Sequence, residues 1–247
     1  MAPQPGIPGR LPQRVMMTAD AGGSIEANSG GRDMKPDHTL LAGPLAAAIF
    51  GLGIGLLPLW IPGYDQIHQT VSEIGMRGSP MEVPFSIMLI AVAVCVLVFG
   101  WGLGAASLRA GHSPLAGYLA ASMAVCAAGI ALFPFPAAPH NYFGMLELVG
   151  YQAPLAFAIA WRRDVRAARL VRLSWLMGAL MWAAIALNLG ALERGGIVWA
   201  YERPFYGLVQ RSLFAVFFLW CAALGAMLHT EERRRTPAGS VTLAKGL

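Results

Sequence analysis

Residues 61–78 read IPGYDQIHQTVSEIGMRG, and this stretch concentrates the polar chemistry of the chain. Its apolar side chains recur at spacings of three and four, which is typical of one face of a helix. These side chains are Tyr64, Ile67, Val71 and Ile74. Polar residues fill the opposite face and its edges: Asp65, His68, Gln69, Ser72 and Glu73. The pattern predicts a short amphipathic helix, and the alternative is that the polar groups simply face water at the end of a longer helix.

The composition is that of an integral membrane protein. Of the 247 residues, 56% are hydrophobic and 13% are charged, whereas soluble domains carry roughly 25% charged residues. The net charge is +5, but no basic run is interleaved with aromatic residues as a nucleic-acid surface requires. We therefore expect the lipid bilayer as the main partner and no nucleic acid. The short helix within residues 61–78 is then expected to lie in the membrane interface.

Six apolar segments are each close to the ~20 residues that cross about 30 Å of hydrocarbon. They are Leu40–Leu59, Val83–Leu108, Leu115–Phe135, Met145–Trp161, Leu173–Leu192 and Phe205–Leu228. The sequence thus predicts an all-α bundle of six transmembrane helices over residues 40–228. The fourth segment is the shortest and carries Glu147, Gln152 and Pro154, so we expect it to be packed inside the bundle.

A polar tail flanks the bundle on each side. Residues 1–39 are rich in Pro, Gly and Ser and have no apolar run, which predicts a disordered tail rather than a signal peptide. Met34 opens the sequence MKPDHTLLAG, which reads like a natural start just before the first span. Residues 229–247 form a basic tail that we expect in the cytoplasm.

Lys and Arg are distributed unevenly between the two sides of the predicted bundle. Fourteen lie in the tails and in the 109–114 and 162–172 loops, against three in the 60–82, 136–144 and 193–204 loops. By the positive-inside rule, both termini are cytoplasmic. The excess of 16 Arg over two Lys, with abundant Ala and Gly, indicates GC-rich coding DNA and a bacterial source. We therefore expect a multi-pass protein of the cytoplasmic (inner) membrane.

Polar residues from three regions converge on the predicted outer face. The candidate ligand-binding residues there are Asp65, Ser72, Glu73, His140, Glu147 and Arg211. Arg211 is the strongest single signal, because a charged side chain near the middle of a span costs about 2.5–3.5 kcal/mol on insertion scales. We expect it to pair with Glu147 or Glu73. The alternative is that Arg211 snorkels to the outer phosphates.

Several short motifs resemble one bacterial membrane family. They are QTVSEIG at 69–75, LFP at 132–134 followed by His140, Gly207-Leu208 with Gln210-Arg211, and Trp220. Over roughly residues 40–228 the chain is similar to the family named domain of unknown function 998. The resemblance implies six helices with a Ser-acid-aliphatic-Gly motif after the first, and one site shared by four residues. These are Ser72, Glu73, His140 and Arg211. Members often carry an acid where this chain has Gln210. The resemblance implies no particular activity, because the family itself has none assigned.

Three functions stay open from the sequence. In the first, an outer-face polar cavity binds a lipid or another anionic amphiphile, with Arg211 holding the phosphate or carboxylate of the head group. In the second, the protein is a membrane-embedded hydrolase. In the third, it is a structural or accessory subunit of a complex with other membrane proteins.

The hydrolase hypothesis has two forms. In the first, Ser72 is the nucleophile, His68 or His140 is the base, and Glu73 or Asp65 orients the base. In the second, a metal bound by His68, Asp65 and His140 assists the reaction, although the chain has no HxxxH or HExxH motif. The three cysteines also lack metal-ligand spacing, so we expect no metal and no cofactor.

Overall fold

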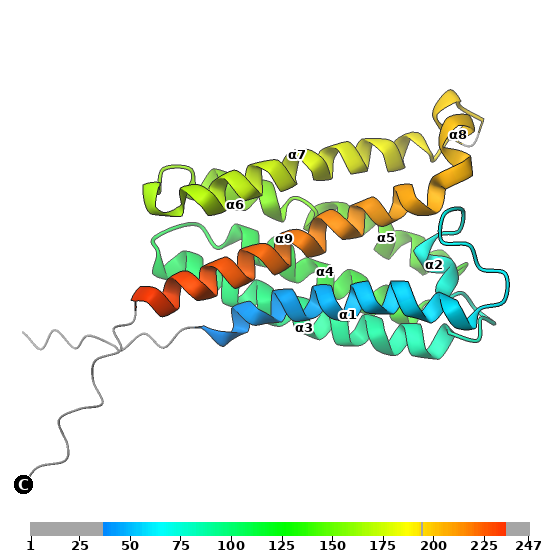
Figure 1. The fold of residues 1–247 in the computed structure, drawn as a ribbon, viewed down its shortest axis with the longest axis horizontal. Coiled ribbons are helices and arrows are strands. Elements are labelled where there is room, and N and C mark those ends of the chain that lie inside the picture. The colour runs from blue at the N-terminus through cyan, green and yellow to red at the C-terminus, as the bar shows by residue number, and fades with distance from the viewer. Residues whose placement is uncertain (1–36, 194, 236–247) are drawn as a thin grey trace, which may run out of the picture. The chain divides into compact units, whose positions relative to one another are not determined.

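The computed structural model describes residues 37–193 and 195–235, and every regular element in these ranges is a helix. Six helical segments are long and apolar enough to cross a membrane (Figure 1). They are His38–Trp60, Glu82–Arg109, Leu115–Leu132, Ala138–Trp161, Val165–Gly190 and Ile197–Arg234. The predicted six-helix membrane bundle is confirmed. The disorder and start site predicted before residue 37, and the tail after residue 235, lie outside the described residues.

The first three spans, the loop helix and the first half of the fourth span contain seven elements. They are η1 (His38–Leu41), α1 (Ala42–Leu56), η2 (Leu57–Trp60), α2 (Val71–Ile74), α3 (Glu82–Arg109), α4 (Leu115–Leu132) and α5 (Ala138–Gly150), the last of which opens the fourth span. The rest of the described chain contains α6 (Ala153–Trp161), η3 (Val165–Ala167), α7 (Ala168–Gly190), α8 (Ile197–Glu202), η4 (Arg203–Phe205) and α9 (Tyr206–Arg235).

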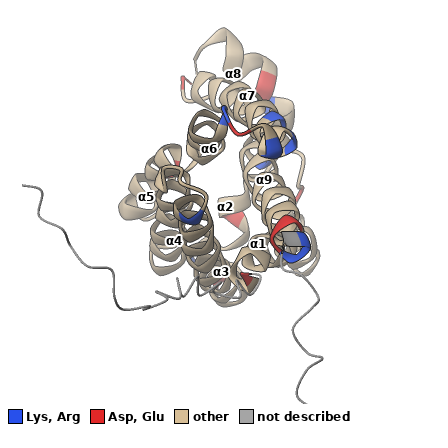
Figure 2. Ribbon diagram, turned by 90° about the vertical axis from the view of Figure 1, so that its left-hand side faces the viewer, with Lys and Arg blue, Asp and Glu red and all other residues tan. Residues whose placement is uncertain are grey.

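The spans run back and forth between two ends of the bundle (Figure 1). The terminal end carries residue 37, the 110–114 connection and the last turns of α9, and the loop end carries the 61–81 loop and α8. Helix α3 packs against α4 and α1, while α9 packs against α1 and α7. Viewed from the terminal end, the described Arg residues gather mainly at that end (Figure 2).

Helices α3 and α4 approach each other closely, and this contact depends on glycine. A Cβ atom on Gly100 would lie 2.6 Å from the carbonyl oxygen of Gly117, and one on Gly117 would lie 2.5 Å from that of Gly100. No side chain fits at these distances. The two backbones therefore touch directly, which is the usual role of small residues between membrane helices.

The predicted interfacial helix is much shorter than the apolar stripe suggests, because only Val71–Ile74 is helical. Before it, side chains bond to nearby backbone groups and stabilise turns in place of a helix. The Asp65 carboxylate accepts from the Ile67 N–H (2.7 Å), and the Gln69 side chain accepts from the Asp65 N–H (2.8 Å). Asp65 therefore caps a turn, and Gly75 ends the four-residue helix.

The fourth span begins at Ala138, seven residues before the predicted Met145, so His140 lies within it. It is also no more enclosed than its neighbours, with 39% of its apolar window buried against 44% for the second and third spans. The expectation of a central fourth helix was wrong. Its outer residues, among them Tyr142 and Met145, are exposed on the bundle surface.

The fourth span is interrupted between α5 and α6, because Pro154 lacks the N–H that would continue the helix. The Gln152 N–H bonds to the Val149 carbonyl (3.2 Å) instead of the Leu148 carbonyl. The Gln152 side chain then donates to the Leu148 carbonyl (2.9 Å). This polar side chain satisfies a backbone group that would otherwise face hydrocarbon.

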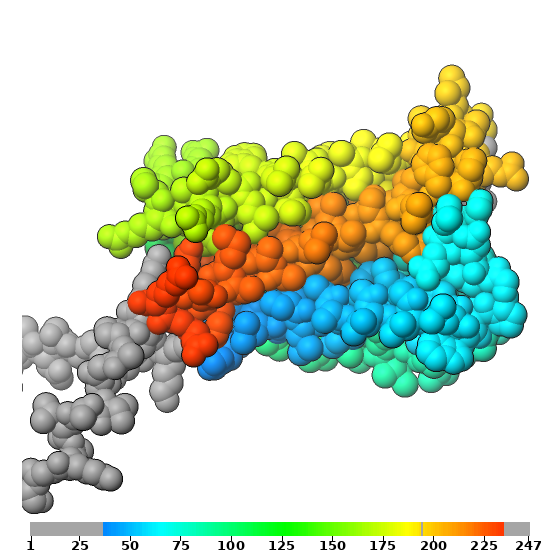
Figure 3. Space-filling model, viewed as in Figure 1, coloured from blue at the N-terminus to red at the C-terminus, as the bar shows by residue number. Residues whose placement is uncertain are grey.

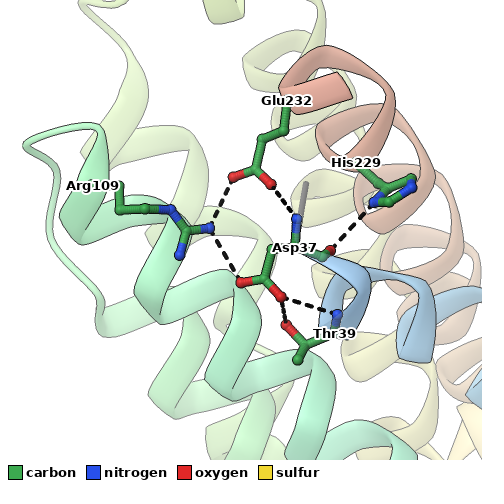
Figure 4. Close-up of polar contacts among 5 residues, drawn as sticks. All are labelled: Asp37, Thr39, Arg109, His229 and Glu232. Atoms are coloured by element: carbon green, nitrogen blue, oxygen red, sulfur yellow. Dashed lines mark hydrogen bonds and ion pairs between the residues drawn. The ribbon is translucent and has the colours of Figure 1, made fainter. Parts of the chain in front are cut away.

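A cluster of charged residues holds three elements together at the terminal end (Figure 4). The Arg109 guanidinium bridges the carboxylates of Asp37 (3.2 Å) and Glu232 (2.9 Å). Glu232 also accepts from the Asp37 N–H (3.0 Å), and His229 bonds to the Asp37 carbonyl (3.3 Å). Residues 37–39 precede the first predicted segment, yet this cluster and η1 make them part of the bundle. Likewise, residues 229–235 of the predicted tail continue α9.

Candidate functional site at the loop end

The 61–81 loop lies against the first turns of α9, as Figure 3 shows at the loop end. Gly207 makes this approach possible, because a Cβ atom there would lie 2.4 Å from the Gln69 carbonyl and 2.6 Å from the Gln66 carbonyl. One helical turn later, Arg211 reaches back to the same loop. Its Nη1 donates to the carbonyls of Gln66 (2.8 Å), Gln69 (2.8 Å) and Gly207 (2.9 Å).

Two more side chains complete this attachment. Arg211 Nη2 donates to the Tyr64 hydroxyl (2.9 Å), which in turn donates to the Thr70 carbonyl (2.7 Å). Burial raises the pKa of Tyr64, although the neighbouring guanidinium opposes this shift. The Gln210 side chain accepts from the Val71 N–H (2.7 Å), a bond that an acid at this position would also form.

The predicted ion pair of Arg211 with Glu147 or Glu73 was wrong. Within residues 37–193 and 195–235, all hydrogen bonds of the guanidinium go to backbone carbonyls and to Tyr64. Its Nε is sealed from solvent without a partner. Arg211 therefore holds the 61–81 loop against α9 through these hydrogen bonds. It is not exposed for an anionic head group.

Ser72 and His140 meet where the loop contacts α5. His140 Nδ1 lies 3.0 Å from the Phe133 carbonyl oxygen, and Nε2 lies 3.0 Å from Ser72 Oγ. Because a carbonyl only accepts, Nδ1 carries the proton in the neutral ring, and the Ser72 hydroxyl donates to Nε2. This is the pairing of a nucleophile with a general base, oriented by a backbone carbonyl instead of the expected carboxylate.

His68 and Asp65 lie apart from this pair, on the exposed surface of the loop. His68 Nδ1 is 2.7 Å from the Asp65 carboxylate. The N–H of Ile67, followed by His68, lowers the pKa of Asp65. Of the two histidines considered as a base, the structure brings His140 to Ser72. The described residues contain no group of three His, Cys, Asp or Glu side chains that could hold a metal ion.

A cavity lies inside the bundle beside this pair. Its walls come from α1, α2, α3, α4, α5 and α9, and all but two of its lining residues are apolar. The two polar lining residues are Ser72, from the loop, and Glu147, from α5. The cavity therefore differs from the polar outer-face cavity predicted from the sequence. It is an apolar chamber with two polar groups.

Glu147 is buried, with 8% of its surface exposed. Its Oε2 accepts a hydrogen bond from the hydroxyl of Tyr151, one turn along the chain (2.9 Å). Among the described residues, no Lys, Arg or His forms an ion pair with it. Glu147 is thus an acid at the wall of an apolar cavity with a neutral partner only.

The structure divides the six predicted ligand-binding residues into three groups. Ser72 and Glu147 line the cavity, and His140 stands directly behind Ser72. Arg211 fixes the loop that carries Ser72, while Asp65 lies exposed on that loop. No hydrogen bond or ion pair joins Glu73 to the other members within the described ranges. Of the four residues that the family resemblance assigns to one site, Ser72 and His140 are in contact, and Arg211 bonds to the loop that carries Ser72.

The aromatic residues of the cavity were missed from the sequence. Four phenylalanines line it: Phe50, Phe85, Phe214 and Phe218. All four lie within or at the start of apolar spans, where a phenylalanine facing lipid and one facing a cavity look alike. The spacing of four between Phe214 and Phe218, which places both on one helix face, was the only available signal.

Comparison with known proteins agrees with the motifs. The family model described as "Protein of unknown function (DUF998)" matches residues 42–227, from the first span into the last. No curated protein and no solved structure matches the chain.

Proposed function

We propose that this bundle binds an amphiphile whose apolar part occupies the cavity, starting from the fact that the chain belongs to the DUF998 family of proteins of unknown function. The observation that carries the proposal is the lining of the cavity, which has apolar walls and two polar groups. Ligand sites typically combine a predominantly apolar lining with a few placed polar groups. An anionic head group has little support, because Arg211 does not line the cavity and its Nη1 and Nη2 already bond to groups of the protein.

Photolabelling tests this proposal. The probe is a neutral monoacylglycerol with a diazirine on its acyl chain, applied to the purified protein in nanodiscs. We expect adducts on lining residues such as Val92 and Met123, together with adducts on the lipid-facing Trp101, which is 76% exposed. Ala127→Trp fills the cavity, so it should remove the lining adducts and keep the Trp101 adduct. Adducts on lipid-facing residues alone would show that no amphiphile enters.

A membrane-embedded hydrolase is the second candidate, and the Ser72–His140 contact favours it. An ester whose acyl chain lies in the cavity would present its carbonyl carbon to Ser72 at the cavity wall. Ser72 Oγ attacks that carbon as its proton passes to His140 Nε2. The alcohol then leaves with the proton, and a water molecule releases the acid and regenerates Ser72.

A lipophilic fluorophosphonate tests the hydrolase candidate. It should label wild type at Ser72, and Ser72→Ala should abolish the adduct. His140→Gln should slow labelling by about 100-fold, because general-base assistance contributes about 10²–10⁴-fold. Ser79→Ala is the matched control, since Ser79 Oγ donates only to the Ile74 carbonyl. A folded wild-type protein that takes no label at Ser72 would rule this candidate out.

We propose that the bundle lies in the cytoplasmic membrane of a bacterium, with both termini in the cytoplasm. The distribution of Lys and Arg, fourteen against three between the two sides, supports this orientation. The loop end, with Ser72 and the cavity beneath it, then faces the outer side of that membrane.

A further inference from the structure

We propose that the amphiphile bound in this cavity is cationic, and that Glu147 is the counter-ion of its head group. This inference rests on the amphiphile-binding function proposed above and adds the charge of the ligand. Its basis is the combination of one acid with an aromatic lining in the same closed space.

Glu147 alone gives the cavity its charge. Among the described lining residues it is the one ionisable side chain, and the others are apolar apart from Ser72. Arg211, the cation that the sequence suggested as its partner, bonds instead to two loop carbonyls and to a carbonyl of its own helix. A buried carboxylate without a cation is costly in an apolar medium, so a positively charged ligand gains more here than a neutral or negative one.

One carboxylate oxygen remains available for a ligand. Tyr151 donates to Oε2, whereas no residue of the described chain donates to Oε1. The polar atoms that are sealed without a partner in the same ranges are Glu202 Oε2 and Arg211 Nε. Glu147 Oε1 is not one of them, and Glu147 lines the cavity. The unbonded oxygen is therefore open to the cavity.

The phenylalanines supply a second, independent preference for a cation. Phe50 lies between Phe214 (ring centroids 5.2 Å apart) and Phe218 (4.5 Å), and Phe85 lines the cavity from α3. Aromatic faces carry partial negative charge and attract organic cations by about 0.5–2 kcal/mol per contact, which is how quaternary ammonium groups are recognised. An acid and four aromatic rings that line the same apolar cavity suit a lipophilic ammonium or phosphonium ion.

The test uses two rigid ions of nearly equal size and opposite charge, tetraphenylphosphonium and tetraphenylborate. Their binding to the full-length protein is measured by equilibrium dialysis in a neutral maltoside detergent. We expect wild type to bind tetraphenylphosphonium at least tenfold more tightly than tetraphenylborate. Glu147→Gln should weaken phosphonium binding at least tenfold and leave borate binding unchanged, because Gln keeps an acceptor for Tyr151 and loses the charge.

Two further variants separate the possible failures. Glu82→Gln is the matched control, because it removes an acid near the loop end that bonds to the Gly78 N–H and lies outside the cavity. It should bind the phosphonium like wild type, and a thermal unfolding scan verifies that each variant is folded.

If Glu147→Gln binds the phosphonium as tightly as wild type, or both ions bind equally, Glu147 is not the counter-ion. If Ala127→Trp still abolishes binding in that case, the amphiphile cavity stands without it. If neither ion binds and the diazirine lipid labels no lining residue, the proposed function fails as well.

Discussion

At Arg211, the cost of placing a charge in an apolar helix is offset by hydrogen bonds to the backbone. Three carbonyl oxygens and the Tyr64 hydroxyl surround the guanidinium at 2.8–2.9 Å. Two of those carbonyls belong to an irregular loop with no helical partners of its own. The same contacts therefore stabilise the charge and the loop, and hydrogen bonds to charged groups contribute about 1.5–3 kcal/mol each.

A double-mutant cycle tests this assignment. Arg211→Ala and Tyr64→Phe remove groups that touch, so their effects on the free energy of unfolding should be coupled by about 0.5–3 kcal/mol. Arg211→Ala and Glu147→Ala should be additive within about 0.5 kcal/mol, because no hydrogen bond or ion pair joins these two residues in the described structure. Unfolding is followed in mixed micelles by tryptophan fluorescence. Coupling between Arg211 and Glu147, with none to Tyr64, would contradict the arrangement described above.

Gly207 is the residue that makes room for the loop. Gly207→Ala places a methyl group within 2.4–2.8 Å of three loop carbonyls, so it should destabilise the protein by about 1–3 kcal/mol. Gly51→Ala is the control, because a Cβ atom there meets nothing within 4 Å and alanine favours the helix. The measurement is the melting temperature of each variant, which should be lower for Gly207→Ala than for Gly51→Ala. Equal melting temperatures would mean that the loop does not press on α9.

The sequence predicted that Arg211 has a bonding partner within the protein, but the predicted partner was wrong. The reason is physical: a charged residue in a span must be satisfied, but backbone carbonyls have no residue-type signature. The sequence therefore pointed to acidic residues, Glu147 and Glu73, as partners. Ser72 and His140 were found because their side chains carry the chemistry themselves, and only their mutual contact required the structure.

At the scale of helices, the described spans were predicted within a few residues except where polar residues lie inside one. The segment APHNYFG at 138–144 reads as a loop, yet it forms the first two turns of α5 with Pro139 near its start. The opposite error occurred at α2, where the apolar stripe extends beyond the helix. There, side-chain bonds from Asp65 and Gln69 to the backbone override the periodicity.

The cluster at the terminal end predicts how stability depends on pH. Burial tends to raise the pKa of Asp37, but bonds from Thr39 and the Arg109 guanidinium outweigh it, and the net pKa lies below the usual 3.8. A lowered pKa means that the stabilisation by this carboxylate is complete above about pH 4–5 and is lost as the pH falls through the folded-state pKa. Glu232 and His229 bond to the backbone of Asp37, and the His38 ring packs against the His229 ring.

We therefore expect wild type to exceed Asp37→Asn in melting temperature at pH 5–7. The difference should shrink steadily between pH 4 and pH 2.5, because both proteins then carry a neutral group at this position. The measurement is a pair of thermal unfolding series over this pH range at constant ionic strength. A difference that stays constant down to pH 2.5 would show that the Asp37 carboxylate contributes no charge interaction.

At the scale of the whole molecule, the cavity is the feature that the sequence could not reveal. Its walls combine side chains from six helices, and phenylalanines such as Phe50 and Phe85 occur equally on lipid-facing surfaces. The sequence marked the cavity only through Ser72 and Glu147, whose polarity is unusual in such surroundings. Which faces of the helices turn inward depends on packing, and six weakly amphipathic spans leave that choice open.

The orientation of the bundle is the remaining whole-molecule prediction. The connections at the terminal end are rich in Arg, as at 162–172, while those at the loop end carry few basic residues. Moving the basic terminal end across the membrane would oppose the insertion bias for Lys and Arg. An alkaline phosphatase reporter, active only outside the cytoplasm, should thus be silent when fused after Arg235 or after His112. It should be active when fused after Gly195.

A fluorescent protein that matures only in the cytoplasm should give the reverse pattern at the same three positions. Immunoblots of each fusion serve as the control, so that a silent reporter is not confused with a degraded one. Active phosphatase after Arg235 together with a silent fusion after Gly195 would invert the bundle. Ser72 and the cavity would then open toward the cytoplasm, and an amphiphile would reach Glu147 from the inner leaflet instead of the outer one.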